Sequence, residues 1–224
     1  MQGQRPDLEW RAGDVPVSTR FGDPYFSLEN GLAETRHVFL SGNGLPARFR
    51  DGFHIAELGF GTGLNLLAAL ACWRESGAQG VLHVTSFEAF PMTPDEMTRA
   101  QAAFPELADL AAELAPHWAA GPRVTLRDLR FEMIAGDARV TLPGWPGRAD
   151  AWFLDGFSPA RNPELWQPEL MTQVGRHTAP GGTAATYSAA GFVRRGLAAA
   201  GFEVARVPGY GRKRHMTIAR KPGA

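Results

Sequence analysis

Glu57-Leu-Gly-Phe-Gly-Thr-Gly63 joins two segments with different apolar patterns. The short run 53–58 before it predicts a buried strand, and the apolar residues of 64–72 after it repeat at helical spacing. Its glycines allow a tight turn and a close approach of the backbone to a ligand. The helix that follows would direct its free N–H groups at an anionic group. The stretch therefore predicts a strand, a turn and a helix built around a small ligand.

The spacing of the glycines indicates which ligand. A dinucleotide fingerprint would need a glycine at position 64, where this chain has Leu64. The form E-x-G-x-G-x-G is typical of S-adenosylmethionine sites, with Glu57 close to the methionine ammonium end. Another nucleotide ligand and a purely structural turn remain alternatives on this motif alone.

Strand-like and helical segments alternate on both sides of this unit. The expected strands are 81–87, a hairpin of 123–128 with 129–135, 149–154 and 183–188, and the expected helices are 94–118 broken at Pro105, 165–177 and 190–200. The last two strands, 202–207 and 215–220, are too close in sequence for a helical crossover and should be antiparallel. We therefore expect an α/β fold with a Rossmann-like, doubly wound sheet and a C-terminal antiparallel hairpin. This combination fits a class I S-adenosylmethionine-dependent methyltransferase better than a dehydrogenase.

Length and composition limit the alternatives. At 224 residues, the chain has room for one large domain, expected at 51–224, preceded by a strand-containing extension, 1–50, packed on the core and covering one edge of the sheet. The 23 basic and 23 acidic residues balance, which argues against a uniformly basic nucleic-acid binder. No membrane span or signal peptide is evident, so we expect a cytoplasmic protein without a membrane partner. Cys72 is the single cysteine and the histidines show no ligand spacing, so no metal is expected.

Acidic residues follow three successive strands. Glu88 stands where nucleotide-binding folds accept hydrogen bonds from ribose hydroxyls. Asp137, after Gly136, stands where methyltransferases contact the adenine amino group, and Asp155 ends a third strand. Because the carboxyl ends of parallel strands share one sheet edge, these acids should surround one ligand.

The run Asp155-Gly-Phe-Ser-Pro159 lies where amino methyltransferases carry their acceptor loop. An amine attacks a methyl group only as the neutral base, so a carboxylate that orients it and takes its proton suits this position. Asp155 is therefore the candidate catalytic residue. Phe157 could stack on a base, exclude solvent or belong to the core.

The C-terminal part carries a local charge excess. Residues 191–224 hold eight basic residues and one acid. Such a patch neutralises phosphates without reading sequence. The run Gly209-Tyr-Gly-Arg-Lys-Arg-His215 adds an aromatic ring and suits a single-stranded RNA loop, with a solvated basic face as the alternative.

Nearly the whole chain resembles a known family, most specifically in Asp150-Ala-Trp-Phe-Leu-Asp-Gly-Phe-Ser-Pro-Ala-Arg-Asn-Pro163 and Gly191-Phe-Val-Arg-Arg-Gly-Leu197. The other matching segments are 17–18, 25–27, 30–40, 42–43, 57–65, 86–88, 180–183, 200–202 and 209–214. The family is that of the tRNA 5-methylaminomethyl-2-thiouridine methyltransferases, the methyltransferase half of the bifunctional bacterial enzyme MnmC and its stand-alone relatives.

The resemblance implies methyl transfer from S-adenosylmethionine to the amine of 5-aminomethyl-(2-thio)uridine at the tRNA wobble position. Position by position, it implies cofactor contacts from Glu57, Gly59, Phe60, Gly61, Gly63, Asn65, Glu88, Asp137 and Asp155. Asp155 and Phe157 would face the modified base, and Tyr25 and the segment 30–36 would lie over the cofactor or acceptor. The anticodon arm would meet Arg194, Arg195, Arg212, Lys213 and Arg214.

The bifunctional enzymes also carry an FAD-dependent oxidase domain, which we do not expect in these 224 residues. The aminomethyl group would then come from a separate oxidase or another aminomethyl-forming enzyme. Two other functions remain open: a small-molecule amine methyltransferase, and a non-catalytic RNA-binding module with a degenerate cofactor pocket.

Overall fold

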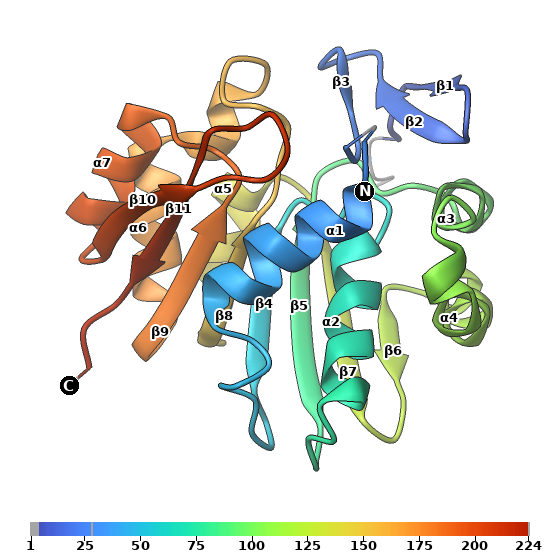
Figure 1. Cartoon of the computed structure of the whole chain (residues 1–224), viewed down its shortest axis with the longest axis horizontal. Helices are drawn as coiled ribbons and strands as arrows, with labels where there is room; N and C mark the ends of the chain where they lie inside the picture. Colours follow the sequence, from blue (N-terminus) through green and yellow to red (C-terminus); the bar gives the residue numbers. More distant parts are fainter. Residues whose placement is uncertain (1–4, 28, 224) are drawn as a thin grey trace.

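A mixed sheet with helices on both faces forms the body of the molecule (Figure 1). The computed structural model describes residues 5–27 and 29–223. Within these ranges, eight strands form the sheet in the order β10-β11-β9-β8-β4-β5-β7-β6. Their bounds are β4 His54–Leu58, β5 Leu82–Glu88, β6 Arg123–Thr125, β7 Leu129–Ala135, β8 Ala149–Leu154, β9 Thr178–Thr186, β10 Glu203–Pro208 and β11 His215–Arg220.

The pairing confirms the predicted fold class. Strands β7, β5, β4, β8 and β9 are parallel, whereas β6 pairs antiparallel with β7 and β11 pairs antiparallel with both β9 and β10. The order reverses at β4, where β5 lies on one side and β8 on the other. This reversal opens a crevice at the carboxyl ends of the strands.

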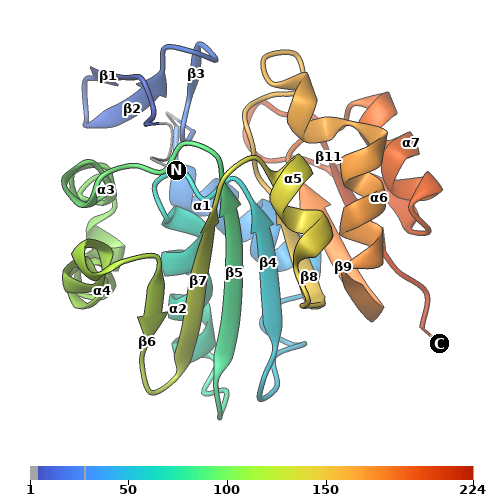
Figure 2. The same ribbon diagram turned by 180° about the vertical axis from the view of Figure 1, so that it is seen from behind.

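The helices cover the two faces unequally (Figures 1 and 2). One face carries α1 Gly31–Thr35, α2 Leu64–Glu75, α3 Pro94–Gln101 and α4 Ala108–Ala120. The other face carries α5 Ala138–Thr141, α6 Pro168–Arg176 and α7 Gly191–Ala199. Successive side chains of a strand point to opposite faces of the sheet. Ile55 and Phe153 therefore join the core on the first face, whereas Ala56 and Trp152 join the core on the second.

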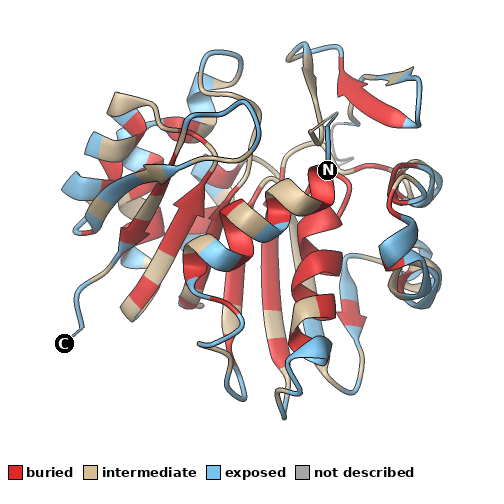
Figure 3. Ribbon diagram, viewed as in Figure 1, coloured by how far each residue is buried: buried red, intermediate tan, exposed pale blue. Residues whose placement is uncertain are grey.

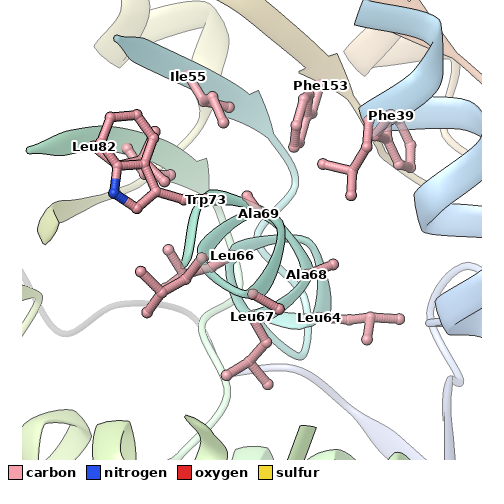
Figure 4. Packing of buried hydrophobic residues seen from close by; sticks show 14 of the residues in the cluster. Phe39, Ile55, Leu64, Leu66, Leu67, Ala68, Ala69, Trp73, Leu82 and Phe153 are labelled. Carbon is pink, nitrogen blue, oxygen red and sulfur yellow. The ribbon is translucent and has the colours of Figure 1, made fainter. Parts of the chain in front are cut away.

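Helix α2 is the most buried helix of the first face. Leu67 and Leu70 have no exposed surface, and Figure 4 shows the α2 side chains among Phe39, Ile55 and Phe153. A helix that is apolar nearly all round must be covered on every side. Figure 3 shows this burial continuing through the central strands. The turn before α2 therefore has a rigid support.

The N-terminal extension differs from the prediction in one respect. Its strands β1 Leu8–Arg11, β2 Val15–Ser18 and β3 Asp23–Pro24 form a separate antiparallel sheet near the carboxyl edge of the main sheet (Figure 1). Helix α1 continues through a π-helical turn, Arg36–Leu40, into 41–43, which packs on a face of the main sheet rather than on an edge. Gly42 comes so close to the interior strand β9 that a Cβ would lie 2.9 Å from the Cβ of Ala185.

Strand β9 also begins earlier than predicted. The sequence placed its start at Thr183, after a Pro-Gly-Gly break, but pairing with β8 starts at Thr178. Ala149 pairs with Thr178 and Ala151 with Thr183, so the break is a bulge within the strand. Within the described ranges, no helix is long and apolar enough to cross a membrane.

Candidate active site

A cavity of about 1380 Å³ opens at the carboxyl edge of the sheet. Its lining comes from the ends of β4, β5, β7, β8 and β9, from N-terminal residues at 20–27 and 29–35, and from the β10–β11 loop. The predicted site residues that line it are Tyr25, Gly59, Phe60, Gly61, Asn65, Glu88, Asp137, Asp155, Phe157, Arg212 and Lys213. Those outside the lining are Glu57, Gly63, Arg194, Arg195 and Arg214.

The glycine turn after β4 is set by close backbone contacts. Gly59 has a φ of +88°, and a Cβ there would lie 1.9 Å from the backbone oxygen of Asp155. Gly63, with a φ of +75°, is the N-cap residue of α2, and no side chain caps that helix end. The turn thus leaves room for a ligand and presents the N-terminus of α2 near it.

Glu88 connects this turn to the end of β5. Its Oε2 accepts a hydrogen bond from the Gly61 N–H at 2.9 Å, and its Oε1 accepts one from the Phe90 N–H at 2.8 Å. Burial raises the pKa of the Glu88 carboxyl, while these backbone donors act in the opposite direction. Glu88 lines the cavity, and its contact with a ribose hydroxyl stays a prediction.

We expect Glu88→Gln to raise the dissociation constant of the methyl donor at least about tenfold. The amide has one acceptor oxygen where the carboxylate has two, so a ribose hydroxyl would lose its acceptor in the complex, and an unsatisfied buried hydrogen-bonding group costs about 1–3 kcal/mol. Calorimetric titration with S-adenosylmethionine measures the change. Glu132→Gln, on β7 and outside the cavity lining, is the matched control and should leave the affinity unchanged. Equal affinities for both variants would remove Glu88 from the donor site.

Beneath the cavity, an amide links two buried carboxyls. The Asn65 Nδ2 donates to Glu57 Oε1 at 2.8 Å and to Asp155 Oδ2 at 2.7 Å, while its Oδ1 accepts from the Thr35 hydroxyl at 2.9 Å. The second oxygen of Glu57 accepts from the Ser86 hydroxyl at 2.7 Å. The structure therefore does not bring Glu57 to the cavity as the sequence predicted, because Ser86 and Asn65 occupy its carboxylate. Burial raises its pKa to about 8.

Asp155 faces the cavity from the end of β8. Burial raises the pKa of its carboxyl to about 7; the Asn65 hydrogen bond lowers it, Glu34 raises it and Lys213 lowers it. A carboxyl with a pKa near neutrality can accept a proton at physiological pH. This is the chemistry that the sequence assigned to Asp155.

An aromatic wall stands beside Asp155. The Phe157 ring stacks on Phe21 at 4.7 Å between centroids and meets Tyr25 edge-on at 4.9 Å. The Ser158 N–H donates to Asp23 Oδ2 at 2.9 Å, which ties this loop to the N-terminal sheet. Phe157 therefore belongs to a packed wall of the cavity and does not stand free.

Several lining residues were not singled out from the sequence. Phe21 offered no distinguishing signal within the extension. Tyr187 could have been found, because it directly follows the carboxyl end of β9, the same edge as the other candidates. Its hydroxyl donates to the Gly156 carbonyl at 2.6 Å.

Asp137 begins α5 and is engaged by its neighbour. Its Oδ1 accepts from the Arg139 N–H at 2.9 Å, and the Arg139 side chain also pairs with the carboxylate. This contact lowers the pKa of Asp137. Asp137 lines the cavity, while a contact with an adenine remains a prediction.

The basic residues fall into two sets. In the cavity lining, Arg212 pairs with Glu29 and Lys213 pairs with Glu34, each at 2.7 Å. Outside it, Arg194 and Arg214 lie near His215 together with Arg206. Desolvation, followed by the charges of these arginines, lowers the pKa of this histidine. The described part of the chain holds no cluster of His, Cys, Asp or Glu that could bind a metal ion.

The fold and cavity define a class of enzyme. A glycine turn after the first strand of a doubly wound sheet, with acidic residues at the next strand ends, is the arrangement that binds a nucleoside-bearing cofactor. The uncapped N-terminus of α2 suits a carboxylate, and Glu88 suits ribose hydroxyls, so these residues fit S-adenosylmethionine.

Comparison with known proteins specifies the family. Residues 105–222 match the model of a family described as S-adenosyl-L-methionine-dependent methyltransferase, and the chain belongs to this family. The chain is 49% identical over 225 residues to the "tRNA 5-methylaminomethyl-2-thiouridine biosynthesis bifunctional protein MnmC" of Caulobacter vibrioides, covering 96% of this chain and 38% of that protein. For the protein of the same name from Chromobacterium violaceum, the identity is 45% and the coverage 100% and 36%. The chain thus spans less than two fifths of these relatives.

A solved structure agrees with this assignment. The crystal structure of MNMC2 from Aquifex aeolicus superposes with a TM-score of 0.77 at 26% identity and covers all of this chain and 72% of that one. A methyltransferase from Pyrococcus furiosus, at 15% identity and a TM-score of 0.52, covers 97% of this chain and 89% of that one and shares the fold. The chain is a class I S-adenosylmethionine-dependent methyltransferase, and its resemblance to the MnmC methyltransferases is confirmed.

Proposed function

We propose that this protein methylates the primary amine of 5-aminomethyl-(2-thio)uridine at the wobble position of tRNA, giving 5-methylaminomethyl-(2-thio)uridine. The observation that carries the proposal is the placement of Asp155, held by Asn65, in the same cavity as the glycine turn. The names of the relatives at 45–49% identity supply the acceptor. Because the acceptor is a tRNA, we place the reaction in the cytoplasm.

The donor site combines three parts of the sheet edge. The turn at 59–63 and the N-terminus of α2 would hold the methionine end, Glu88 the ribose and Asp137 the adenine. The bound sulfonium supplies an electrophilic methyl group with a good leaving group. The remaining task of the protein is to align and deprotonate the acceptor.

Asp155 carries out the deprotonation in this proposal. An aliphatic amine is mostly protonated near pH 7 and must lose a proton before its lone pair can attack. The carboxylate accepts that proton, and the Asn65 amide holds the carboxylate in place. The wall of Tyr25 and Phe157 keeps water from the reacting nitrogen and offers ring surface to the uracil.

The rate should depend on pH in a way that follows from Asp155. Only the ionised carboxylate accepts a proton, so kcat/KM should rise with pH through about 7, where its pKa lies in the free protein. Initial rates with subsaturating tRNA between pH 5 and 9 measure this limb. A limb near pH 4, the range of an ordinary aspartate, would contradict the assignment.

Transfer of labelled methyl groups to three acceptors distinguishes the functions that the sequence left open. The proposal predicts labelling of tRNA that carries the aminomethyl group and none of tRNA that lacks it. A small-molecule amine methyltransferase would instead label free aliphatic amines. An RNA-binding module would label nothing and would bind tRNA equally well after Asp155→Ala.

The basic surface beside the cavity would hold the anticodon arm in this proposal. Arg194, Arg195, Arg212 and Arg214 remain the predicted backbone contacts. The structure adds Arg206, which lies near His215 together with Arg194 and Arg214. The positions of Arg194 and Arg214 outside the cavity suit phosphates that stay on the surface while one nucleotide enters.

A further inference from the structure

Lys213 points into the cavity, although it belongs to the most basic loop of the chain. Its Nζ lies 2.7 Å from Glu34 Oε1 and 4.1 Å from the centroid of the Tyr187 ring. All three residues line the cavity. The Glu34 side chain is 13% exposed and the Lys213 side chain 45%, so the carboxylate of the pair is shielded from solvent more than the ammonium group.

Tyr187 also contacts the acceptor loop. Its hydroxyl donates to the carbonyl of Gly156, the residue after Asp155. A cation over the ring face favours one orientation of the ring. Lys213, Tyr187 and the 155–156 backbone therefore form one continuous chain of contacts.

The next residue along the loop behaves differently. Arg214 is exposed, as Lys213 is, but it lies outside the cavity lining and has no ion pair with any other residue in the described ranges. A phosphate could bind Arg214 without competition from an ion pair, whereas at Lys213 it would compete with the Glu34 carboxylate.

We propose that Lys213 and Glu34 are positioning residues of the acceptor subsite, which fix Tyr187 against the Asp155–Gly156 backbone and set the electrostatic surroundings of Asp155, and that Lys213 does not bind a tRNA phosphate. This inference rests on the proposed function.

The inference can be tested because Glu34 and Lys213 act on the pKa of Asp155 in opposite directions. The polar and titratable groups that face or influence Asp155 are Asn65 on α2, Glu57 on β4, Glu34 on α1, Lys213 in the β10–β11 loop and Tyr187 after β9. Of these, Glu34 raises the pKa of Asp155 and Lys213 lowers it. Removing the lysine should therefore raise this pKa, and removing the carboxylate should lower it.

The first experiment measures pH profiles of kcat/KM for Lys213→Met, Lys213→Arg and Glu34→Gln. Lys213→Met should move the acid limb to higher pH. Its loss of kcat/KM relative to the wild type should then be roughly tenfold larger below the limb than at high pH. Glu34→Gln should move the limb to lower pH, and Lys213→Arg, which keeps the cation, should restore the wild-type limb. Unshifted limbs in both Lys213→Met and Glu34→Gln, with thermal unfolding as in the wild type, would overturn the inference.

The second experiment measures the salt dependence of tRNA binding. Arg214→Met is the matched control and should lower the slope of log affinity against log salt by roughly 0.7–0.9, as expected for one lost phosphate contact. Lys213→Met should leave the slope unchanged. A slope reduced by Lys213→Met as much as by Arg214→Met would make Lys213 a phosphate contact and overturn the inference.

Different results would contradict the proposed function and the inference about Lys213 and Glu34. If the wild-type protein methylates no aminomethyl-bearing tRNA, the proposed function fails. If the wild type is active but the variants leave the acid limb unshifted, or Lys213→Met reduces the salt slope as much as Arg214→Met, only the inference about Lys213 and Glu34 fails.

Discussion

Asp155→Asn is expected to lower kcat for methyl transfer by about 10²–10⁴-fold, the range for loss of a general base. The amide oxygen of the variant can still accept the Asn65 hydrogen bond, so the fold and the cavity should persist. What is lost is the group that takes the proton from the amine. Single-turnover transfer to aminomethyl-bearing tRNA measures the effect without interference from product release.

Glu164→Gln is the matched control for this loss. Glu164 also lines the cavity, but it is exposed and follows the acceptor loop at its rim. Its replacement should change kcat by less than about twofold, in line with the small effects of surface substitutions. An Asp155→Asn protein as active as Glu164→Gln would exclude proton transfer to Asp155.

Gly59→Ala is expected to lower the free energy of unfolding by at least about 3 kcal/mol and to abolish measurable donor binding. The added Cβ would lie 1.9 Å from the Asp155 carbonyl oxygen, which belongs to the backbone and cannot rotate away. Relief of this clash must move either the glycine turn or the acceptor loop. Denaturant unfolding and calorimetric titration measure the two effects.

Gly77→Ala separates the steric clash from the strain of a positive φ. Gly77 has a φ of +70°, and a Cβ there would meet nothing within 4 Å. This variant should lose only about 1–2 kcal/mol and keep its donor affinity. Equal losses in the two variants would show that the contact between the turn and Asp155 is not tight.

The parts of the fold that the sequence predicted are those with local signals. The strand, glycine turn and helix at 53–72 follow from apolar periodicity and glycine spacing. The antiparallel ending follows from the short connection between β10 and β11. The strand β9 began earlier than predicted because its Pro-Gly-Gly run forms a bulge paired with β8, and such pairing is a tertiary effect.

The site was predictable to the extent that it lies at strand ends. Glu88, Asp137 and Asp155 were placed at one edge of the sheet by topology alone, and the structure brings all three to one cavity. The sequence could not reveal that Glu57 is enclosed by Ser86 and Asn65. Nor could it show that Lys213 meets Glu34, because 179 residues separate the two and each suits a solvated surface equally well.

The most direct test of the account is a crystal structure with S-adenosylhomocysteine and an anticodon stem-loop that carries the aminomethyl group. We expect the cofactor at the 59–63 turn and the substrate amine within hydrogen-bond reach of Asp155, about 2.6–3.2 Å. The amine nitrogen should also face the cofactor sulfur, so that a methyl carbon placed there lies about 3–3.5 Å away. A nucleobase bound outside the cavity, or an Asp155 carboxylate turned away from the amine, would contradict the account.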